Sequence, residues 1–581
     1  MCAARPDAVH NSSARKIPGP VATTSLALRL GIGVLAANAR VIDAAAHRNR
    51  SLQKNPSDIE DSDTMSFTPT PEQSAAVSAF TTGDNLVIEA GAGTGKTSTL
   101  RQLADVDPSR RGLYLAFNKS VQVEAENKFA GTNVTAMTAN ALAYKDFGRP
   151  MRHKLDRGSQ MRSAQRAEIL GIKLPLLAKA PGETFGVRVP KHVAVRLVSE
   201  TLKNFCRSNA GVLTPDLVPI PPTMMMSDAE TADAQEQLVK FAQRYWDDVR
   251  DPNGILPYQH DFYMKQWAMS NPRIDADYIL FDEAQDADAL VSSVVQAQTG
   301  TQIVAVGDKN QAIYRWRGAI DAMDAFGGKR YQLTKSFRFG HAIAEEANVW
   351  LDLLNADLRI QGSDKPSSVW ESKNRIPEAI LCRTNAGAIA EVIYSHRLGV
   401  PVAIGGKNRA KQMRALAEAC QSLMKDGWTR HPDLDMFTSW EAVQEYVEED
   451  DGAELAPLVK LVDRHGAANL ITAIDNCVPS NRARTVIATA HVAKGMEWKH
   501  VRISDDFYIP GRTDDGEIEK LDTAEAMLAY VSITRAMRHL DPGGLAWVRD
   551  YKRSLARPEI GIEWRRRFMD VRREARDDYV A

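Results

Sequence analysis

The chain has few cysteines and almost no net charge. Its 581 residues include five cysteines, none in a Cys-x-x-Cys pair, which argues against disulfides, structural zinc and iron–sulfur clusters. Lys and Arg total 73 against 74 Asp and Glu, so any polyanion would need a local groove. The apolar stretch at 30–39 is too short to span a bilayer. We therefore expect a protein of a reducing, intracellular setting.

Length and N-terminal composition indicate several parts. A chain this long, with 44% hydrophobic residues, predicts about three to five domains or subdomains. Up to Lys54 there are eight Lys and Arg against two Asp, a composition similar to that of a transit peptide. Regular patterning begins at Met65. We expect 1–64 to be a disordered leader, or the product of a start codon placed too early, and assign it no function.

A phosphate-binding loop is predicted at 85–104, "NLVIEAGAGTGKTSTLRQLA". An apolar strand leads through a glycine-rich turn into a helix, so backbone N–H groups and the helix N-terminus would surround phosphate. Lys96 would reach the β and γ phosphates, and Thr97 would ligate Mg²⁺. A chance glycine turn is the alternative. The residues predicted to bind the nucleotide here are Ala90, Gly91, Ala92, Gly93, Thr94, Gly95, Lys96 and Thr97.

A second apolar strand ends in two carboxylates at 277–288, "DYILFDEAQDAD". Asp282 at the strand tip would hold Mg²⁺, and Glu283 would position and polarise the attacking water. Alone, such a pair is usually a helix cap or a solvated turn. Together with the upstream loop it predicts a nucleoside triphosphatase. About 180 residues separate the two motifs, so an insert must lie between them.

A third strand leads into "GDKNQAIYRWRGA" at 307–319. Asp308 and Gln311 follow the strand end, where α/β sheets bind ligands, and are placed to sense a γ-phosphate. Trp316, beside Arg317, is either ordinary core or a platform on which a base stacks.

These motifs, with six others in order, resemble those of superfamily 1 helicases of the UvrD/Rep class over most of 67–547. The others are "TPEQ" (70–73), "AFNKS" (116–120), "SFRFG" (336–340), "ILCRTNA" (380–386), "TAHVAKGMEW" (489–498) and "AYVSITRA" (529–536). Ala90 is the residue that this class places at the head of its phosphate loop. "FNKS" and a short second insert resemble the F-box DNA helicase branch, without an F-box, and small phage or bacterial relatives.

The resemblance implies ATP and Mg²⁺ as cofactors and a role for each matching residue. Gln73 would read the adenine edge, Phe337 would stack on adenine and Glu497 would touch the ribose. Arg338 and Arg535 would be arginine fingers. The residues matching the single-stranded DNA path are Phe117, Asn118, Lys119, Thr138, Trp316, Arg317 and His491.

The resemblance further implies an α/β fold with two RecA-like P-loop motor domains, each interrupted by a mainly helical insert. Motor 1 would comprise 65–145 and 266–322, with its insert at 146–265. Motor 2 would comprise 323–395 and 482–550, with a short insert at 396–481. A basic C-terminal tail would occupy 551–581 as a solvated helix or a partner contact.

The implied function is an ATP-dependent 3′–5′ DNA helicase or translocase in repair, recombination or replication. "VAKGMEW" with "YRWRGA" matches the 3′–5′ branch. Two alternatives stay open: a translocase that strips proteins from single strands, and a nucleic-acid-gated NTPase switch in a defence or repair complex. We expect single-stranded DNA and single-strand/duplex junctions as partners, a protein partner at the tail or second insert, no membrane, and a cytoplasmic location in a bacterial or phage setting.

The first prediction separates the two interpretations of Trp316. If it stacks a base, Trp316→Ala should weaken single-strand affinity by about 1–3 kcal/mol, with little sequence preference, while ATPase activity without DNA survives. If it is core, the substitution should cost about 3–5 kcal/mol of stability and damage every activity together. Thermal unfolding and the DNA-free ATPase rate of the purified variant decide between them.

Overall fold

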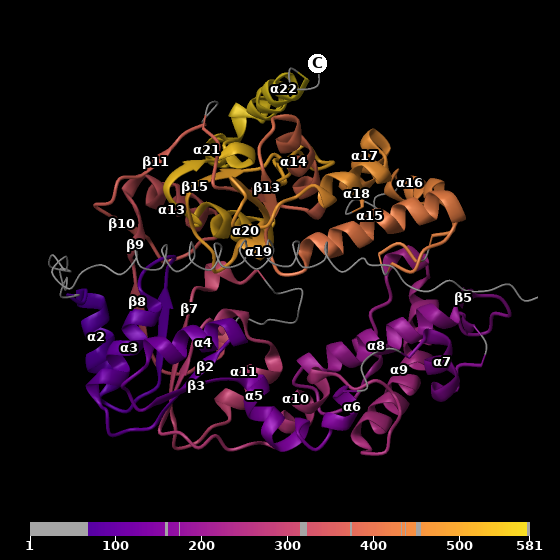
Figure 1. Cartoon of the computed structure of the whole chain (residues 1–581), viewed down its shortest axis with the longest axis horizontal. Helices are drawn as coiled ribbons and strands as arrows, with labels where there is room; N and C mark the ends of the chain where they lie inside the picture. Colours follow the sequence, from indigo (N-terminus) through magenta and orange to yellow (C-terminus); the bar gives the residue numbers. More distant parts are fainter. Residues whose placement is uncertain are drawn as a thin grey trace, which may run out of the picture. The chain divides into compact units, whose positions relative to one another are not determined.

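The computed structural model describes residues 68–156, 161–173, 175–313, 322–371, 375–431, 433–435, 437–448 and 455–577. The predicted leader and the predicted DNA contacts Trp316 and Arg317 lie outside these residues. Two six-stranded parallel sheets flanked by helices dominate the described part (Figure 1). This is the mixed α/β, RecA-like P-loop fold that the motifs predict.

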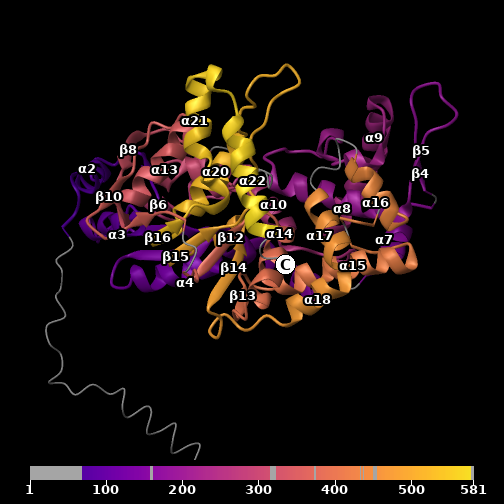
Figure 2. The same ribbon diagram turned by 90° about the horizontal axis from the view of Figure 1, so that it is seen from above.

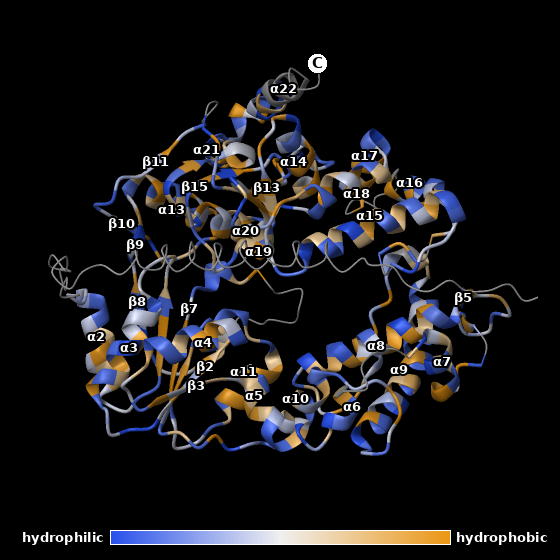
Figure 3. Cartoon of the chain, in the orientation of Figure 1, coloured by the Kyte–Doolittle hydropathy of each residue, from blue (hydrophilic) through white to orange (hydrophobic). Residues whose placement is uncertain are grey.

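The first sheet is parallel throughout. Because the inner parallel strands are covered on both faces, they read as nearly continuous apolar runs, which Figure 3 shows largely in the hydrophobic colour, whereas the edge strand at 329–333 is polar and mostly exposed. All their carboxyl ends therefore lie at one edge. The strand order is β3 (Val134–Thr138), β2 (Gly112–Ala116), β6 (Tyr278–Phe281), β7 (Gln302–Gly307), β1 (Leu86–Ala90) and β8 (Lys329–Leu333).

Helices α2 (Pro71–Phe80), α3 (Lys96–Val106), α4 (Lys119–Lys128) and α11 (Ala289–Gln296) belong to the same motor (Figure 1). Helix α2 begins with a capping box, in which Thr70 accepts from the Gln73 N–H and Gln73 accepts from the Thr70 N–H. Pro71 occupies its first turn, where a missing N–H costs nothing. The "TPEQ" motif is therefore a helix start as well as a predicted adenine contact.

The first insert is mainly helical. Its longest helices bury apolar faces against the first motor in a shared core that includes Val198, Leu238 and Phe262. A short antiparallel hairpin, β4 (Leu176–Ala178) and β5 (Val187–Val189), interrupts the helices, and its loop projects from them in Figure 2. Phe185 in this loop is 85% exposed. The helices of the insert, with those that border it on either side, are α5 (Ala139–Ala143), the π-helical turn η1 (Tyr144–Gly148), α6 (Arg152–Asp156), α7 (Ser163–Leu170), α8 (Lys191–Arg207), α9 (Asp228–Arg250) and α10 (His260–Met269).

The second sheet is also parallel. Its order is β11 (Ser368–Val369), β16 (Ala536–Asp541), β15 (Trp498–Ile503), β12 (Ala379–Cys382), β14 (Thr485–Thr489) and β13 (Val402–Ile404), with a separate pair β9 (Lys335–Gly340) and β10 (Gln361–Ser363). Helix α20 (Thr523–Ile533) is buried all round from Ala526 to Ile533. It packs with α13 (His341–Leu353) and α19 (Ala490–Ala493), while α14 (Asn385–Arg397) covers β12–β14.

The second insert consists, among the described residues, of α15 (Arg409–Asp426), α16 (Trp440–Glu448), α17 (Ala456–His465) and α18 (Ala467–Asp475). These helices pack their apolar faces together and against α14. Throughout the described chain, every helix is too short or too polar to cross a membrane.

Strand pairing corrects two predicted boundaries. The sequence places 323 onward in motor 2, yet β8 at 329–333 pairs with β1 and completes the first sheet. It also places 396 onward in the second insert, yet β13 at 402–404 pairs with β14 and forms the edge of the second sheet. Both strands are short, with five residues in β8 and three in β13, so no local periodicity marks the sheet to which each belongs.

The predicted solvated tail is partly packed. Tyr551 lies in α21 (Val548–Ala556) and is buried in the second motor, so this motor extends past 550. Beyond it, α22 (Glu563–Asp577) presents Trp564, whose ring stacks 6.0 Å from that of buried Trp547. The Trp564 Nε1–H also donates to Ser554 Oγ at 2.9 Å. Trp564, with Phe568 one turn further along, therefore ties a highly charged helix to the motor.

The second prediction tests this anchor. Trp564→Ala should lower stability by about 2 kcal/mol, since it removes a half-buried indole and its hydrogen bond. Thermal unfolding should show a lower midpoint. Arg566→Ala, an exposed change on the same helix, is the control and should leave the midpoint unchanged. Equal midpoints for both variants would contradict the anchoring role.

Candidate active site

The loop between β1 and α3 needs glycine for two reasons. Gly93 and Gly95 have φ of 73° and 81°, in the left-handed region that residues with a side chain rarely adopt. A Cβ at Gly93 would also lie 2.5 Å from Arg338 Cβ and 2.7 Å from Ser336 Oγ. Backbone of this loop therefore approaches β9 of the second motor closely.

Lys96 and Glu283 form an ion pair, with Nζ and Oε1 2.7 Å apart. Burial lowers the pKa of Lys96, but Glu283 and Asp282 outweigh it, so the pKa lies above its ordinary value. Burial raises the pKa of Glu283, but Lys96 and Lys494 outweigh it and bring the pKa to about 2. A carboxylate so acidic is a weak proton acceptor. Glu283 therefore carries its negative charge at neutral pH beside the Lys96 ammonium.

Asp282 is buried at the end of β6, where it accepts a 2.5 Å hydrogen bond from Tyr114 Oη. Burial and the neighbouring charge of Glu283 raise its pKa. A cation beside this carboxylate would relieve both effects, so Asp282 fits the predicted Mg²⁺ ligand, with Thr97 at the start of α3 as the second. Within the described ranges no cluster of three His, Cys, Asp or Glu side chains could hold a metal by itself. Mg²⁺ commonly takes one or two protein ligands together with phosphate oxygens and water.

Gln311 is gripped from both motors. Its Nε2 donates to Asp308 Oδ2 at 2.7 Å, and its Oε1 accepts from Arg535 Nη2 at 3.2 Å. Burial, and then the nearby charge of Arg338, lower the pKa of Arg535 to about 9, so its guanidinium stays charged at neutral pH. Arg338 itself donates to Glu497 Oε2 at 2.7 Å. The two predicted arginine fingers therefore lie at the motor boundary, and one is paired with the predicted ribose contact.

The predicted adenine contacts converge on Gly95. A Cβ there would lie 3.2 Å from Gln73 Nε2 and 3.5 Å from the Phe337 ring. Gln73 is buried and also donates from Nε2 to Thr99 Oγ1 at 3.1 Å. A carboxamide has two N–H donors and two oxygen lone pairs, so Gln73 keeps one of each beyond its bonds to Thr70 and Thr99. Reading an adenine edge stays a prediction that this geometry permits.

Of the predicted DNA contacts, Phe117 and Thr138 line one cavity of about 230 Å³ that reaches Asp282 and Glu283. Phe117 is 46% exposed, and Lys119 is exposed.

Asn118 and Thr138 also cap helices, because their side chains accept from the N–H groups of Val121 and Ala141. His491 lies on α19 of the second motor. Sequence reasoning missed the Arg207 and Asp261 that the first insert contributes to this cavity.

A buried ion pair that the sequence analysis missed crosses the motor boundary. Lys494 Nζ lies 2.6 Å from Asp286 Oδ2 and donates to the Gln311 main-chain oxygen at 2.5 Å. Both residues belong to motifs quoted for the resemblance, "TAHVAKGMEW" and "DEAQD". Their motif membership was a signal, but their pairing, 208 positions apart, is visible only in the fold.

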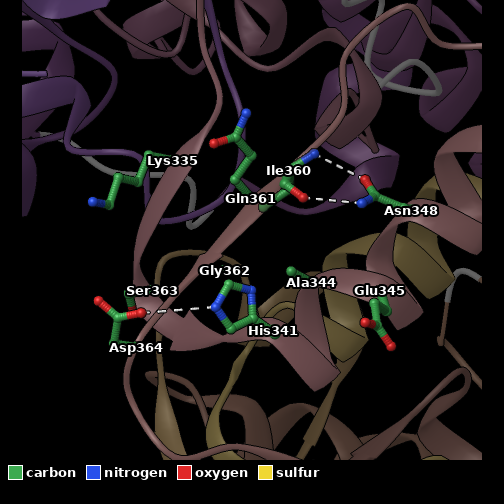
Figure 4. Close-up of a pocket in the computed structure, with 10 residues that line it drawn as sticks. All are labelled: Lys335, His341, Ala344, Glu345, Asn348, Ile360, Gln361, Gly362, Ser363 and Asp364. Carbon is green, nitrogen blue, oxygen red and sulfur yellow. Dashed lines mark hydrogen bonds and ion pairs between the residues drawn. The ribbon is translucent and has the colours of Figure 1, made fainter. Parts of the chain in front are cut away.

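A second cavity, of about 380 Å³, lies on the second motor beside β9, α13 and β10 (Figure 4). Lys335 and His341 face it together with Glu345 and Asp364, so its charge has no single sign. No predicted site residue lines it.

Comparisons with known proteins identify a family model and DNA helicases to which the chain is similar. A family model described as an AAA domain matches residues 73–317, the span that holds the loop, the Asp282–Glu283 pair and Gln311. F-box DNA helicase protein 1 of Schizosaccharomyces pombe is 29% identical over 507 aligned residues, covering 79% of this chain and 55% of that protein. F-box DNA helicase 1 of Gallus gallus is 26% identical over 500, covering 79% of this chain and 47% of that protein.

These comparisons support a superfamily 1 helicase. The chain spans about half the length of the curated relatives that it matches. Similarity to F-box DNA helicases agrees with the branch that "FNKS" and the short second insert indicate. Membership of the UvrD/Rep class and a bacterial or phage origin stay predictions, as do the roles of the individual site residues.

The third prediction addresses the ion pair and the finger. Lys96→Ala, Glu283→Gln and Arg535→Ala should each nearly abolish ATP hydrolysis, because they remove phosphate binding, water positioning and charge stabilisation respectively. For Arg535 the loss should be on the order of 10³–10⁵-fold. Steady-state ATPase rates with single-stranded DNA provide the measurement.

The matched control is Lys335→Ala, an exposed cation on the same strand as Arg338, which should keep the wild-type rate. Wild-type turnover in any of the three variants would remove that residue from its assigned role.

Proposed function

We propose that the chain is an ATP-dependent DNA helicase or translocase that moves 3′–5′ on single-stranded DNA. The observation that carries this proposal is the grip on Gln311, which Asp308 holds from the first motor and Arg535 from the second. A group that senses the γ-phosphate and is shared by two motors would link hydrolysis to their relative motion. ATP with Mg²⁺ would supply the free energy and part of the charge neutralisation at the phosphates.

The order of the first sheet supports coupling to a strand. Strands β6, β7 and β1 end in the nucleotide groups, while the adjoining β2 and β3 end at Phe117 and Thr138. The cavity beside them reaches the carboxylates of Asp282 and Glu283. Stacking one base is worth about 1–3 kcal/mol, comparable to one duplex step at about 1.4, so a fixed grip cannot drive motion and hydrolysis must alter it.

DNA as the strand is supported by the names of the two relatives, both DNA helicases. The 3′–5′ direction is supported by the "VAKGMEW" and "YRWRGA" sequences. A second candidate is a translocase that strips proteins from single strands without strong unwinding. The small second insert favours it, because in the described part only four helices stand where the class places its duplex-binding subdomain.

The fourth prediction tests this function directly. The full chain with ATP should unwind a duplex that carries a 3′ single-stranded tail, and should leave a blunt or 5′-tailed duplex largely intact. Glu283→Gln should unwind none of them. Strand separation followed by gel or fluorescence is the measurement.

Other outcomes would redirect the proposal. Unwinding of the 5′-tailed duplex alone would reverse the assigned direction. DNA-stimulated ATPase without unwinding would favour the stripping translocase. ATPase that DNA does not stimulate would contradict both candidates.

A further inference from the structure

Tyr530 extends from α20 of the second motor into the nucleotide site of the first. It is fully buried, and its Oη donates to Asp308 Oδ2 at 2.9 Å. The same oxygen accepts a longer bond, 3.4 Å, from the Ala92 N–H of the phosphate loop. Burial and the charge of Asp308 hold the pKa of Tyr530 well above its ordinary value, so the hydroxyl keeps its proton and remains a donor.

Asp308 depends on such donors. It has no exposed surface, and besides Tyr530 it accepts from Gln311 Nε2 at 2.7 Å and from the Asn310 N–H at 3.1 Å. Its own N–H donates to Gln285 Oε1 at 3.1 Å. A buried carboxylate that loses a donor is left partly unsatisfied, and it moves or shifts its remaining bonds to recover one.

The remaining bond of Asp308 to a side chain is the one that orients Gln311. The Tyr530 hydroxyl and the Gln311 amide share a single oxygen, Oδ2. The other end of the Gln311 carboxamide is held by Arg535, five residues beyond Tyr530 on the same motor. Loss of the hydroxyl would therefore free Asp308 to turn, and Gln311 would lose its fixed orientation toward the phosphates.

We propose that Tyr530 is a positioning residue that holds Asp308, and through it Gln311, in register with the phosphate loop only while the two motors are together. This inference rests on the proposed function. It adds a way in which contact between the two motors depends on whether the bound nucleotide carries a γ-phosphate. The aromatic ring fills space that phenylalanine would also fill, so the role belongs to the hydroxyl. Separation of the motors withdraws that hydroxyl and releases Gln311.

The test is Tyr530→Phe in the full chain, with a poly-dT oligonucleotide as the single strand. We expect kcat of DNA-stimulated ATP hydrolysis to fall about tenfold while KM for ATP changes less than about twofold, because Lys96 and the loop N–H groups still bind phosphate. We also expect the ratio of oligonucleotide affinities, measured with a non-hydrolysable ATP analogue and with ADP, to move toward one. A merely structural defect would instead weaken nucleotide and strand binding together.

The matched control is Tyr551→Phe, which also removes a buried hydroxyl from the second motor, where it donates to the Glu519 carbonyl at 3.0 Å. It should keep the wild-type kcat and affinity ratio. Wild-type values in Tyr530→Phe would overturn the inference and leave the proposed function standing. A wild-type chain without DNA-stimulated ATPase would overturn the proposed function first, and this inference with it.

A second variant keeps the test decisive if Tyr530→Phe folds poorly. Asp308→Asn leaves one carbonyl oxygen, with two lone pairs, for the three donors Tyr530, Gln311 and the Asn310 N–H, so one donor loses its acceptor and the variant should show the same fall in kcat with KM preserved. If Tyr530 acts through Asp308, the double variant should be no slower than the slower single variant. Losses that multiply, or an Asp308→Asn with wild-type kcat, would overturn the inference.

Discussion

The carboxamide of Gln311 is the group on which the arrangement of this protein depends. The carboxamide nitrogen donates to Asp308 in the first motor, and the carboxamide oxygen accepts from Arg535 in the second. The main-chain oxygen of Gln311 accepts from Lys494. Lys494 in turn pairs with Asp286 of the first motor. Because these groups are buried, breaking any of these bonds leaves a polar atom without water to replace the lost partner, so each bond is costly to break.

The topology of the first sheet explains why the predicted nucleotide-binding residues and the predicted DNA-binding residues lie so close together. With every strand of the first sheet parallel, each carboxyl end opens on the same edge, and neighbouring strands are about 5 Å apart. The predicted nucleotide-binding residues follow β1, β6 and β7, and the predicted DNA-binding residues Phe117 and Thr138 lie at the ends of β2 and β3. Asp282, Phe117 and Thr138 therefore line the same cavity.

The sequence was informative where chemistry is local and silent where it is distant. The loop at 91–97 and the strand that leads to Asp282 each lie within about ten residues, so spacing alone predicts them. The pairing of β8 with β1 joins segments more than 240 positions apart, and three-residue β13 carries no periodic signal. Tyr530 and Lys494 lie inside recognisable motifs, yet the residues that they contact lie in the other motor. Neither motif contains information about which residues those are.

The close approach of the phosphate loop to β9 makes Gly93 a spacer as well as a turn. A Cβ on this residue would lie 2.5 Å from Arg338 Cβ and 2.7 Å from the Ser336 hydroxyl oxygen, so only hydrogen fits there. The absence of a side chain at Gly93 sets how closely the phosphate loop and β9 can approach each other. It thereby sets how completely the two motors can exclude water from the phosphates of a bound nucleotide. A single methyl group at this position would clash with β9 and keep the two motors apart at the site, even with every predicted catalytic side chain intact.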